Sequence, residues 1–412
     1  MKEPNFIQKI FSVTNVPEEK IIYLFGLKFE LARNKIFKTK YGNLPIDKNK
    51  IVFAQFSGKG FGDNPKYIAK EIIKQKLPYK LVWLVKDTAN EDLLNEFPPE
   101  IKIINFRSKK ALKELATAKL WIDNQKKLYF LNKGLIKKEG QKYIQTWHGS
   151  LGIKKFGGDL PDELTENFKE KSIKDSNMTD YLLSNSEFEN KIFPRAQWYN
   201  NEIVMLGHPR NDILINGTKQ EKELIREKLN LPNDVKLALY APTYRDDGRL
   251  YCYGLEYQNI IKSLENKFGD KWILLMRLHP NAARFSNKLV PAADNIVDVS
   301  AYQDMQELLL VSDLLITDYS SCIFDFMLTG KPAFIYANDF EEYNNDRGFY
   351  YSLKDTPFPV AQTNCEMTDN IANFNEKDYK IKVDKFLQSK GCIEDGKASK
   401  RVVELIKSIM EK

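Results

Sequence analysis

Short apolar runs alternate with longer segments of mixed polarity along most of this 412-residue chain. The runs have the length and the β-branched or aromatic content that are typical of buried strands. The predicted strands are 51–56, 80–85, 101–106, 120–123, 143–147, 181–184 and 203–207, followed by 236–241, 272–278, 295–299, 314–317 and 333–336. The chain therefore begins a new strand every few dozen residues through most of its length.

The segments between these runs repeat apolar residues at helical spacing. The predicted helices are 64–76, 108–118, 218–229, 256–268 and 305–311. Alternating strands and helices predict parallel sheets with helices on both faces. The alternation forms two series, and a polar stretch at 211–218 separates them. We therefore expect an α/β protein with two doubly wound domains that face each other.

The domain organisation follows from the same pattern. A lead-in precedes the first series, and it contains a strand-like run at 21–29 and a basic, polar segment at 34–41. The tail from residue 375 onward predicts two helices around Gly391 and Gly396. The predicted parts are a lead-in at 1–48, an N-terminal domain at 49–214, a C-terminal domain at 215–390 and a C-terminal helix at 391–412.

Composition narrows the function classes. The hydrophobic content of 42% suffices for two cores, and the formal net charge is +7, mostly from lysine. That surplus suits an anionic ligand or an anionic membrane surface, and a lysine-rich genome explains it equally well. Lysines gather at 108–119 and 132–142, where a solvated helix face accounts for them at least as well as a membrane does. Basic and aromatic residues do not cluster on one element, so nucleic acid is not an expected partner.

Other features point to a reduced, cytoplasmic protein. The four cysteines are scattered and form no zinc-binding or disulfide pattern. We find no signal peptide and no apolar stretch of about 18 residues, so we expect no transmembrane helix. An Asp-x-Asp triplet is absent, and the adjacent Asp246 and Asp247 have the character of turn residues. We therefore expect neither a metal site nor a cofactor.

The three histidines of the chain share one sequence context. His148 lies in QTWHGS, His208 in GHPRND and His279 in MRLHPN, and each follows an apolar run. Open α/β sheets bind ligands at the carboxyl ends of their strands, and histidine is well suited to proton transfer near neutral pH. One such histidine would most simply be structural, but three in the same context favour a functional site.

A predicted strand at 314–317 ends at Asp318, and a helix follows from Cys322. Ser320 and Ser321 then lie at the helix N-terminus, where backbone N–H groups and the helix dipole favour an anion. Asp325 follows one turn later. Ser320 also fits an ordinary N-cap. We interpret this segment as a phosphate-binding turn.

Further candidates follow other predicted strands. Thr243 and Arg245 in YAPTYRDD project from a loop that Pro242 separates from its strand. The fork of Arg245 matches the paired oxygens of a diphosphate. Arg277 and His279 alternate at a strand end, so both side chains can face one cleft.

The remaining candidates lie in the N-terminal half and at the junction. Arg210 lies in the loop between the two series, where clefts form. Gly149 allows the backbone to approach a ligand closely, and Lys154 and Lys155 follow within two turns. The glycine-rich run at 57–62 matches neither nucleotide-binding fingerprint, and we interpret it as a flexible strand–helix turn.

Five of these motifs together resemble a known family. WHGSLGIKK, GHPRND, YAPTYRDD, RLHP and SDLLITDYSSCIFDF occur in the order found in the CDP-glycerol glycerophosphotransferases, the group of teichoic-acid primases and polymerases. The resemblance covers most of residues 51–351. It implies a GT-B fold, in which two Rossmann-like domains face each other across a cleft. The N-terminal domain would take the acceptor and the C-terminal domain the CDP-linked donor.

The resemblance also implies residue roles. His148 is the expected general base, and His279 is a second catalytic candidate beside the donor diphosphate; His208 stands at a variable position and is not expected to be catalytic. On the acceptor side it implies Ser150, Lys154 and Lys155, although Ser150-Leu151 replaces the Thr-Pro that the family commonly has after WHG. The implied donor-binding residues are Gly149, Arg210, Thr243, Arg245, Arg277, His279, Asp318, Ser320, Ser321 and Asp325.

The implied activity is transfer of an alditol phosphate, with glycerol phosphate favoured, from a CDP-alditol to a hydroxyl of a lipid-linked or polymeric glycan acceptor. CMP is released, and the product belongs to teichoic-acid-like or capsular polymers. The implied location is the inner face of the cytoplasmic membrane, with peripheral attachment. A CDP-ribitol donor, a GT-B glycosyltransferase that uses nucleotide sugars, and a non-catalytic binding protein are the alternatives. Primase or polymerase action, the acceptor and the oligomeric state stay open.

Overall fold

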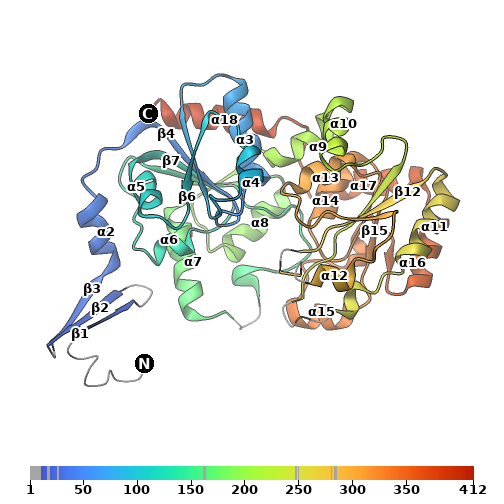
Figure 1. Ribbon diagram of the computed structural model, residues 1–412, viewed down its shortest axis with the longest axis horizontal. Helices are drawn as coiled ribbons and strands as arrows, with labels where there is room; N and C mark the ends of the chain where they lie inside the picture. Colours follow the sequence, from blue (N-terminus) through green and yellow to red (C-terminus); the bar gives the residue numbers. More distant parts are fainter. Residues whose placement is uncertain are drawn as a thin grey trace.

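Two parallel β-sheets, each packed between helices, form the body of the protein (Figure 1). The computed structural model describes residues 11–15, 19–25, 27–160, 164–245, 248, 250–279, 281–282 and 285–412. Every strand pair within the two large sheets is parallel. The predicted α/β architecture with two parallel sheets is therefore confirmed.

The first sheet has seven strands in the order β10-β9-β8-β7-β4-β5-β6. Their bounds are β4 (Asp47–Ala54), β5 (Lys80–Val85), β6 (Ile101–Asn105), β7 (Ala118–Asp123), β8 (Lys142–Gln145), β9 (Tyr181–Ser184) and β10 (Glu202–Met205). Strand order reverses between β4 and β7, and ligands of doubly wound sheets bind beyond the carboxyl ends of strands at such a reversal. The loops after β4, β7 and β8 are therefore placed to form a site.

Helices from two parts of the chain cover this sheet. Its own helices are α3 (Asp63–Lys74), α4 (Glu91–Asn95), α5 (Lys109–Thr117), α6 (Leu128–Leu131), α7 (Glu166–Met178) and α8 (Glu187–Ala196), with a 3₁₀ turn η1 (Gly157–Asp159). Helix α18 (Ala398–Met410) returns from beyond the second sheet to join them. Its Val402 and Ile406 are fully buried in one core with Ile51 and Phe53 of β4.

The second sheet has six strands in the order β13-β12-β11-β14-β15-β16. The strands are β11 (Lys236–Tyr240), β12 (Trp272–Met276), β13 (Ile296–Asp298), β14 (Leu314–Thr317), β15 (Ala333–Tyr336) and β16 (Val360–Ala361). The helices around it are α9 (Asp212–Asn216), α10 (Lys219–Lys228), α11 (Tyr257–Phe268), α12 (Ser286–Leu289), α13 (Met305–Val311), α14 (Cys322–Phe326), α15 (Phe340–Arg347), α16 (Asn364–Ala372) and α17 (Glu376–Ser389). Short 3₁₀ turns are η2 (Pro209–Asn211), η3 (Tyr251–Tyr253), η5 (Met327–Thr329) and η6 (Leu353–Asp355). Here the order reverses between β11 and β14.

A buried ionic cluster joins the two domains. Nζ of Lys66, on α3, lies 2.6 Å from carboxylate oxygens of both Asp304 and Glu307 at the start of α13. The Tyr67 hydroxyl donates a hydrogen bond to Asp304 at 3.0 Å. The side chains of Lys66 and Asp304 are only 5% and 3% exposed, so this cluster crosses the interface out of contact with bulk water. We call these four residues the interdomain cluster.

The lead-in differs from its prediction. A single strand-like run was predicted at 21–29, but the structure has three antiparallel strands, β1 (Phe11–Asn15), β2 (Glu19–Leu24) and β3 (Leu27–Ala32), followed by α2 (Arg33–Tyr41). The apolar run divides into two strands because β2 and β3 pair antiparallel, with Leu24 opposite Leu27. This small sheet stands apart from both large sheets, at the lower left of Figure 1.

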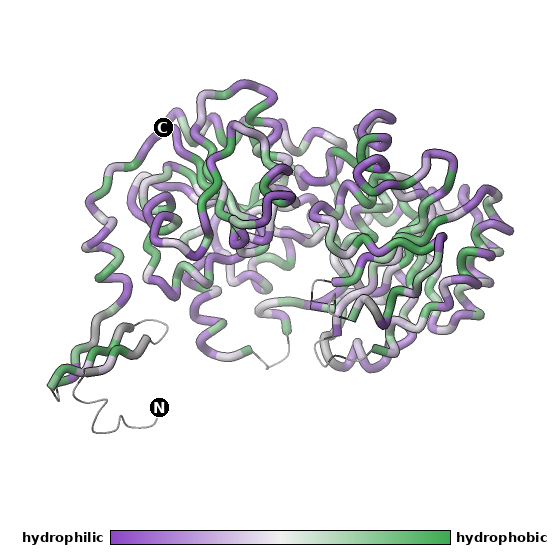
Figure 2. The backbone as a smooth tube through the Cα atoms, in the orientation of Figure 1, coloured by the Kyte–Doolittle hydropathy of each residue, from purple (hydrophilic) through white to green (hydrophobic). Residues whose placement is uncertain are grey.

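The lysine-rich segment 132–142 also differs. The sequence favours a solvated helix for these lysines. In the structure, helix α6 ends at Leu131, and a turn segment leads from it to β8. Gly134 and Gly140 have φ angles of 82° and 81°, which side-chain-bearing residues rarely adopt and a helix does not contain. Across the described residues, we find no helix with the length and hydropathy needed to cross a bilayer. Figure 2 shows that hydrophobic segments gather on the strands of the two large sheets and on the small sheet.

Candidate functional site

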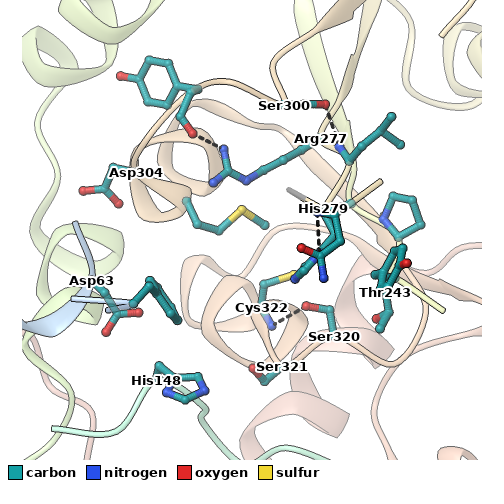
Figure 3. A pocket seen from close by; sticks show the side chains of 18 of the residues that line it. Asp63, His148, Thr243, Arg277, His279, Ser300, Asp304, Ser320, Ser321 and Cys322 are labelled. Atoms are coloured by element: carbon teal, nitrogen blue, oxygen red, sulfur yellow. Dashed lines mark hydrogen bonds between the residues drawn. The ribbon is translucent and has the colours of Figure 1, made fainter. Parts of the chain in front are cut away.

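A cavity of about 1210 Å³ lies between the two domains, at the carboxyl ends of both sheets. Loops of both domains line it, and Figure 3 shows Asp63 and His148 facing Ser321 and Arg277 across it. The sequence-predicted site residues that line it are His148, Lys154, Arg210, Thr243, Arg245, Arg277, His279, Ser320, Ser321 and Asp325. Loops beside both strand-order reversals, the one between β4 and β7 and the one between β11 and β14, thus line one cavity.

His148 is held in a defined orientation beyond β8. Its Nδ1 lies 2.7 Å from the carbonyl oxygen of Asn124, the residue after β7. A carbonyl only accepts, so Nδ1 carries the hydrogen and Nε2 of the neutral ring keeps a lone pair. The Asn124 side chain accepts a hydrogen bond from the Phe56 N–H at 2.8 Å, and the Phe56 ring packs edge-on against the imidazole at 5.3 Å. His148 is therefore arranged as a proton acceptor.

Burial lowers the pKa of His148 below its ordinary value. The backbone contact with Asn124 and the nearby Asp63 carboxylate act in the opposite direction, and burial prevails. A lowered pKa keeps the ring neutral at physiological pH, which is the form that a general base requires.

Arg277 and His279 follow β12 and line the cavity wall that the second domain forms. Nη1 of Arg277 donates to the carbonyl oxygen of Tyr302, and burial lowers the pKa of this guanidinium. The ring of His279 stacks on Tyr244 with centroids 5.6 Å apart, and its Nδ1 accepts from the Asn281 N–H at 3.2 Å. Strand alternation thus brings both predicted side chains to the cavity.

Ser320 and Ser321 lie half-buried at the cavity wall, directly before α14. The Cys322 N–H approaches the Ser320 hydroxyl at 3.4 Å, a long contact. Ser320 is therefore at most a weak cap of this helix, and both hydroxyls face the cavity wall where the sequence predicts a phosphate.

Arg245 is bound more tightly to the protein than the sequence suggests. Its Nε and Nη2 donate to Asp339 at 2.6 and 2.9 Å, and Nη2 also lies 2.9 Å from Asp318. The guanidinium packs against the rings of Tyr319 and Tyr343. These contacts fix the loop after β11 against the loop after β14, so Arg245 supports the cavity wall. Its direct contact with a diphosphate stays a prediction.

Arg210 has a similar place at the domain junction. Its Nε donates to Asp325 at 3.0 Å, Nη1 lies 3.4 Å from Asp63, and its backbone N–H donates to Asn64 at 3.1 Å. One side chain thus joins η2, α14 and α3. Asp325 is therefore engaged with Arg210 on one side, and its predicted contact with the glycerol end of a donor stays a prediction.

The cavity lining has a lower net positive charge than we expect from the sequence prediction of a diphosphate site. Lys59, Lys154, Arg210, Arg245 and Arg277 line the cavity together with Asp63, Asp298, Asp304 and Asp325. Two of the arginines form the carboxylate clusters described above. Arg210 and Arg245 would therefore contribute less positive charge toward a ligand than their number suggests.

Four predicted residues lie outside the cavity lining: Gly149, Ser150, Lys155 and Asp318. Ser150 is 2% exposed and accepts from the Asn185 side chain at 2.7 Å. The Lys155 N–H donates to the Gly348 carbonyl at 3.1 Å, which ties the loop after His148 to the second domain. Asp318 accepts from the Thr243 N–H at 2.9 Å and pairs with Arg245.

His208 does not line the cavity, so the structure brings only two of the three histidines, His148 and His279, to it. The His208 ring is fully buried, with Nε2 3.3 Å from Glu189. Burial opposes its protonated form, but Glu189 raises the pKa above the ordinary value. Asp246 and Asp247 lie outside the described residues; among those described, no group of His, Cys, Asp or Glu is arranged to hold a metal ion.

Several lining residues were missed from sequence. Phe56, Lys59 and Asp63 follow β4, and Ser300 and Asp304 follow β13. The strand-end rule that selected the histidines applies equally to these two loops. Asp63 also has a φ of 54°, a strained conformation of the kind that is concentrated at functional sites, and only the structure reveals it.

A sequence model of the family "CDP-Glycerol:Poly(glycerophosphate) glycerophosphotransferase" matches residues 36–408. The chain belongs to this family. It is 35% identical over 372 residues to the teichoic acid poly(glycerol phosphate) polymerase of Staphylococcus epidermidis, covering 86% of this chain and 50% of the relative. The corresponding polymerase of Bacillus subtilis is 32% identical over 98% of this chain and 54% of its own length. The chain thus spans about half the length of these two relatives.

Solved structures agree with this family assignment. A variant of the wall teichoic acid polymerase TagF with CDPG superimposes with a TM-score of 0.79 at 30% identity, covering 92% of this chain and 93% of that chain. The UDP-GlcNAc 2-epimerase of Methanocaldococcus jannaschii, at 13% identity and a TM-score of 0.51 over 87% and 99% of the two chains, shares the fold alone. The resemblance and the GT-B fold predicted from sequence are confirmed.

Proposed function

We propose that this protein transfers glycerol phosphate from CDP-glycerol to a hydroxyl of a poly(glycerophosphate)-type acceptor and releases CMP. Family membership and the cavity between two Rossmann-like domains support the proposal. The observation that carries it is the orientation of His148, whose Nδ1 is held by Asn124 so that Nε2 can accept a proton. CDP-ribitol is the alternative donor.

The proposed reaction is a single displacement at phosphorus. Nε2 of His148 removes the proton of the acceptor hydroxyl, the hydroxyl oxygen bonds to the β-phosphorus, and the bond to the CMP oxygen breaks. CMP leaves as a phosphate anion, so strong general-acid assistance is not needed. Arg277, Ser320 and Ser321 line the cavity. In the proposed reaction the guanidinium of Arg277 balances negative charge on the transferred phosphoryl group, and the serine hydroxyls donate hydrogen bonds to it.

We further propose that the acceptor is lipid-linked and that the protein acts at the inner face of the cytoplasmic membrane, in teichoic-acid-like or capsular polymer synthesis. Lys154 lines the cavity from the loop after His148, on the side assigned to the acceptor. A cation there would suit an acceptor chain that already carries phosphates.

The test is CMP release from CDP-glycerol, CDP-ribitol and a panel of UDP- and GDP-sugars, with a lipid or polysaccharide acceptor fraction. We expect release from a CDP-alditol by the wild type and a loss of about a hundredfold or more in His148→Ala, as removal of a general base produces. His208→Gln, outside the cavity, serves as the matched histidine control. Turnover of a nucleotide sugar without CMP release would instead establish a GT-B glycosyltransferase.

A further inference from the structure

Asn64, on α3, is a fully buried asparagine whose amide contacts two other segments of the chain. Its Nδ2 donates to the carbonyl oxygens of Thr146 and Trp147 at 3.1 and 3.2 Å. Its Oδ1 accepts a hydrogen bond from the Arg210 N–H at 3.1 Å. A side-chain amide has two N–H donors, and both are used here on the two residues that precede His148.

The segment before His148 has a strained backbone. Trp147 has a φ of 55°, which is rare for a residue with a side chain. Such conformations persist where the surrounding contacts over-determine them. The Trp147 N–H donates to Oε1 of Gln145 at 3.0 Å, and Asn64 holds the carbonyl at the other end of the same residue. That carbonyl belongs to the peptide unit that joins Trp147 to His148, so its direction fixes the backbone from which the imidazole projects.

The third contact of the amide joins this segment to the domain junction. Arg210, in η2, pairs with Asp325 and approaches Asp63, the residue before Asn64. Asp63 and His148 line the cavity from the first domain (Figure 3). Asn64 itself lies outside the cavity lining, so an effect on the reaction must pass through the groups that it holds.

We propose that Asn64 is a positioning residue for the transfer: it fixes the peptide unit before His148, so that the ring meets the acceptor hydroxyl in one orientation. The inference rests on the proposed function, in which His148 is the general base. Asn124 holds the ring through Nδ1, and Asn64 holds the backbone that carries the ring. The two contacts are complementary, because a ring held at one nitrogen can still shift with its main chain. A misplacement of about 1 Å can cost about a hundredfold in rate.

The test is a double-mutant cycle in the CMP-release assay. We expect Asn64→Ala to lower kcat by about tenfold or more while the KM for CDP-glycerol stays within about twofold, because the amide positions the base and lies outside the cavity lining. In the His148→Ala background the same change should cost less than about twofold, since the residue that it positions is already gone. Asn64→Leu fills the space of the amide without its hydrogen bonds and should give the same pattern, so the result does not depend on the cavity that alanine leaves.

Gln141→Ala is the matched control. Gln141 is 2% exposed, and its Nε2 donates to the carbonyl oxygens of Leu115 and Ala118 at 2.8 and 2.6 Å. It is thus another buried amide of the first domain with two backbone acceptors, and these three residues lie outside the cavity lining. We expect urea unfolding to show a loss of stability in both variants, and kcat to fall only in Asn64→Ala.

NMR of the histidine ring nitrogens gives a readout that needs no turnover. The chain has three histidines, so the signal that disappears in His148→Ala assigns that ring. The wild-type ring should carry its hydrogen on Nδ1, and Asn64→Ala should raise the share that carries it on Nε2, with no change in Gln141→Ala.

Equal losses of kcat in the two backgrounds would show a purely structural role and overturn the inference, as would an unchanged tautomer of His148 in Asn64→Ala. Absence of CMP release by the wild type would refute the proposed function instead. The ring signals would then decide, without turnover, whether Asn64 holds His148.

Discussion

The interdomain cluster gives a sharp prediction about stability. The perturbation is Lys66→Met, which removes the charge and leaves an unbranched apolar side chain one heavy atom shorter. In the wild type, Lys66 neutralises Asp304 and Glu307 together, each at 2.6 Å. The variant leaves both carboxylates between the domains without the cation that pairs directly with each of them.

The magnitude follows from burial. Asp304 and Glu307 are 3% and 12% exposed, so both carboxylates are largely shielded from water. Removing one partner of a buried pair costs about 3–5 kcal/mol. Asp304 keeps hydrogen bonds from the Tyr67 hydroxyl and the Gln306 N–H, and the Tyr302 hydroxyl still donates to Glu307. Because these hydrogen-bond donors remain, we expect the free energy of unfolding to fall by about 3 kcal/mol, the lower end of that range.

The assay is urea unfolding monitored by tryptophan fluorescence, with Lys80→Met as the control. Lys80 pairs with Asp47 at 2.8 Å, but the two side chains are 67% and 29% exposed. A pair open to water contributes about 0–1 kcal/mol. A loss below about 1 kcal/mol in Lys66→Met, equal to that of the control, would refute the argument that burial makes the interdomain cluster a stabilising contact.

Two further predictions concern the reaction. Because burial lowers the pKa of His148, the acid limb of kcat/KM should lie below pH 6.5, with activity lost as pH falls through that pKa. Asp63→Asn removes a carboxylate that favours the protonated ring and should move the limb lower still, whereas a limb above pH 6.5 would contradict the assignment. Activity should also survive EDTA, since protein cations are expected to serve the diphosphate; a loss that magnesium restores would show a metal requirement.

The regular elements of the fold were largely predictable from the sequence. Strands β5, β9, β14 and β15 agree with their predictions to the residue, because polar or turn residues bound each apolar run. The predicted helix 305–311 agrees equally well with α13. The small sheet was not predicted from the sequence, since most of β2 and β3 lies in one nearly continuous apolar run and β1 is short and partly polar.

The candidate site was predictable only in part. The strand-end rule located His148 and His279, because the end of an apolar run is visible in the sequence. The same rule does not identify the carboxylates that pair with the arginines, because the partners are far apart in the sequence. Arg245 and Asp339 are separated by 94 residues, and Arg210 and Asp325 by 115. Whether a guanidinium is directed to a ligand or to a carboxylate depends on which loops meet in space, and no local pattern records that.

The return of α18 to the first sheet has a consequence for synthesis on the ribosome. The core of that sheet includes Val402 and Ile406, yet its last strand ends at Met205. At about 5–20 residues per second, the intervening chain takes roughly 10 to 40 s to make. During that interval the nascent first domain has an open apolar groove in place of α18. The second domain is made and can fold before the first is complete, so the two domains finish folding in the reverse of their order in the chain.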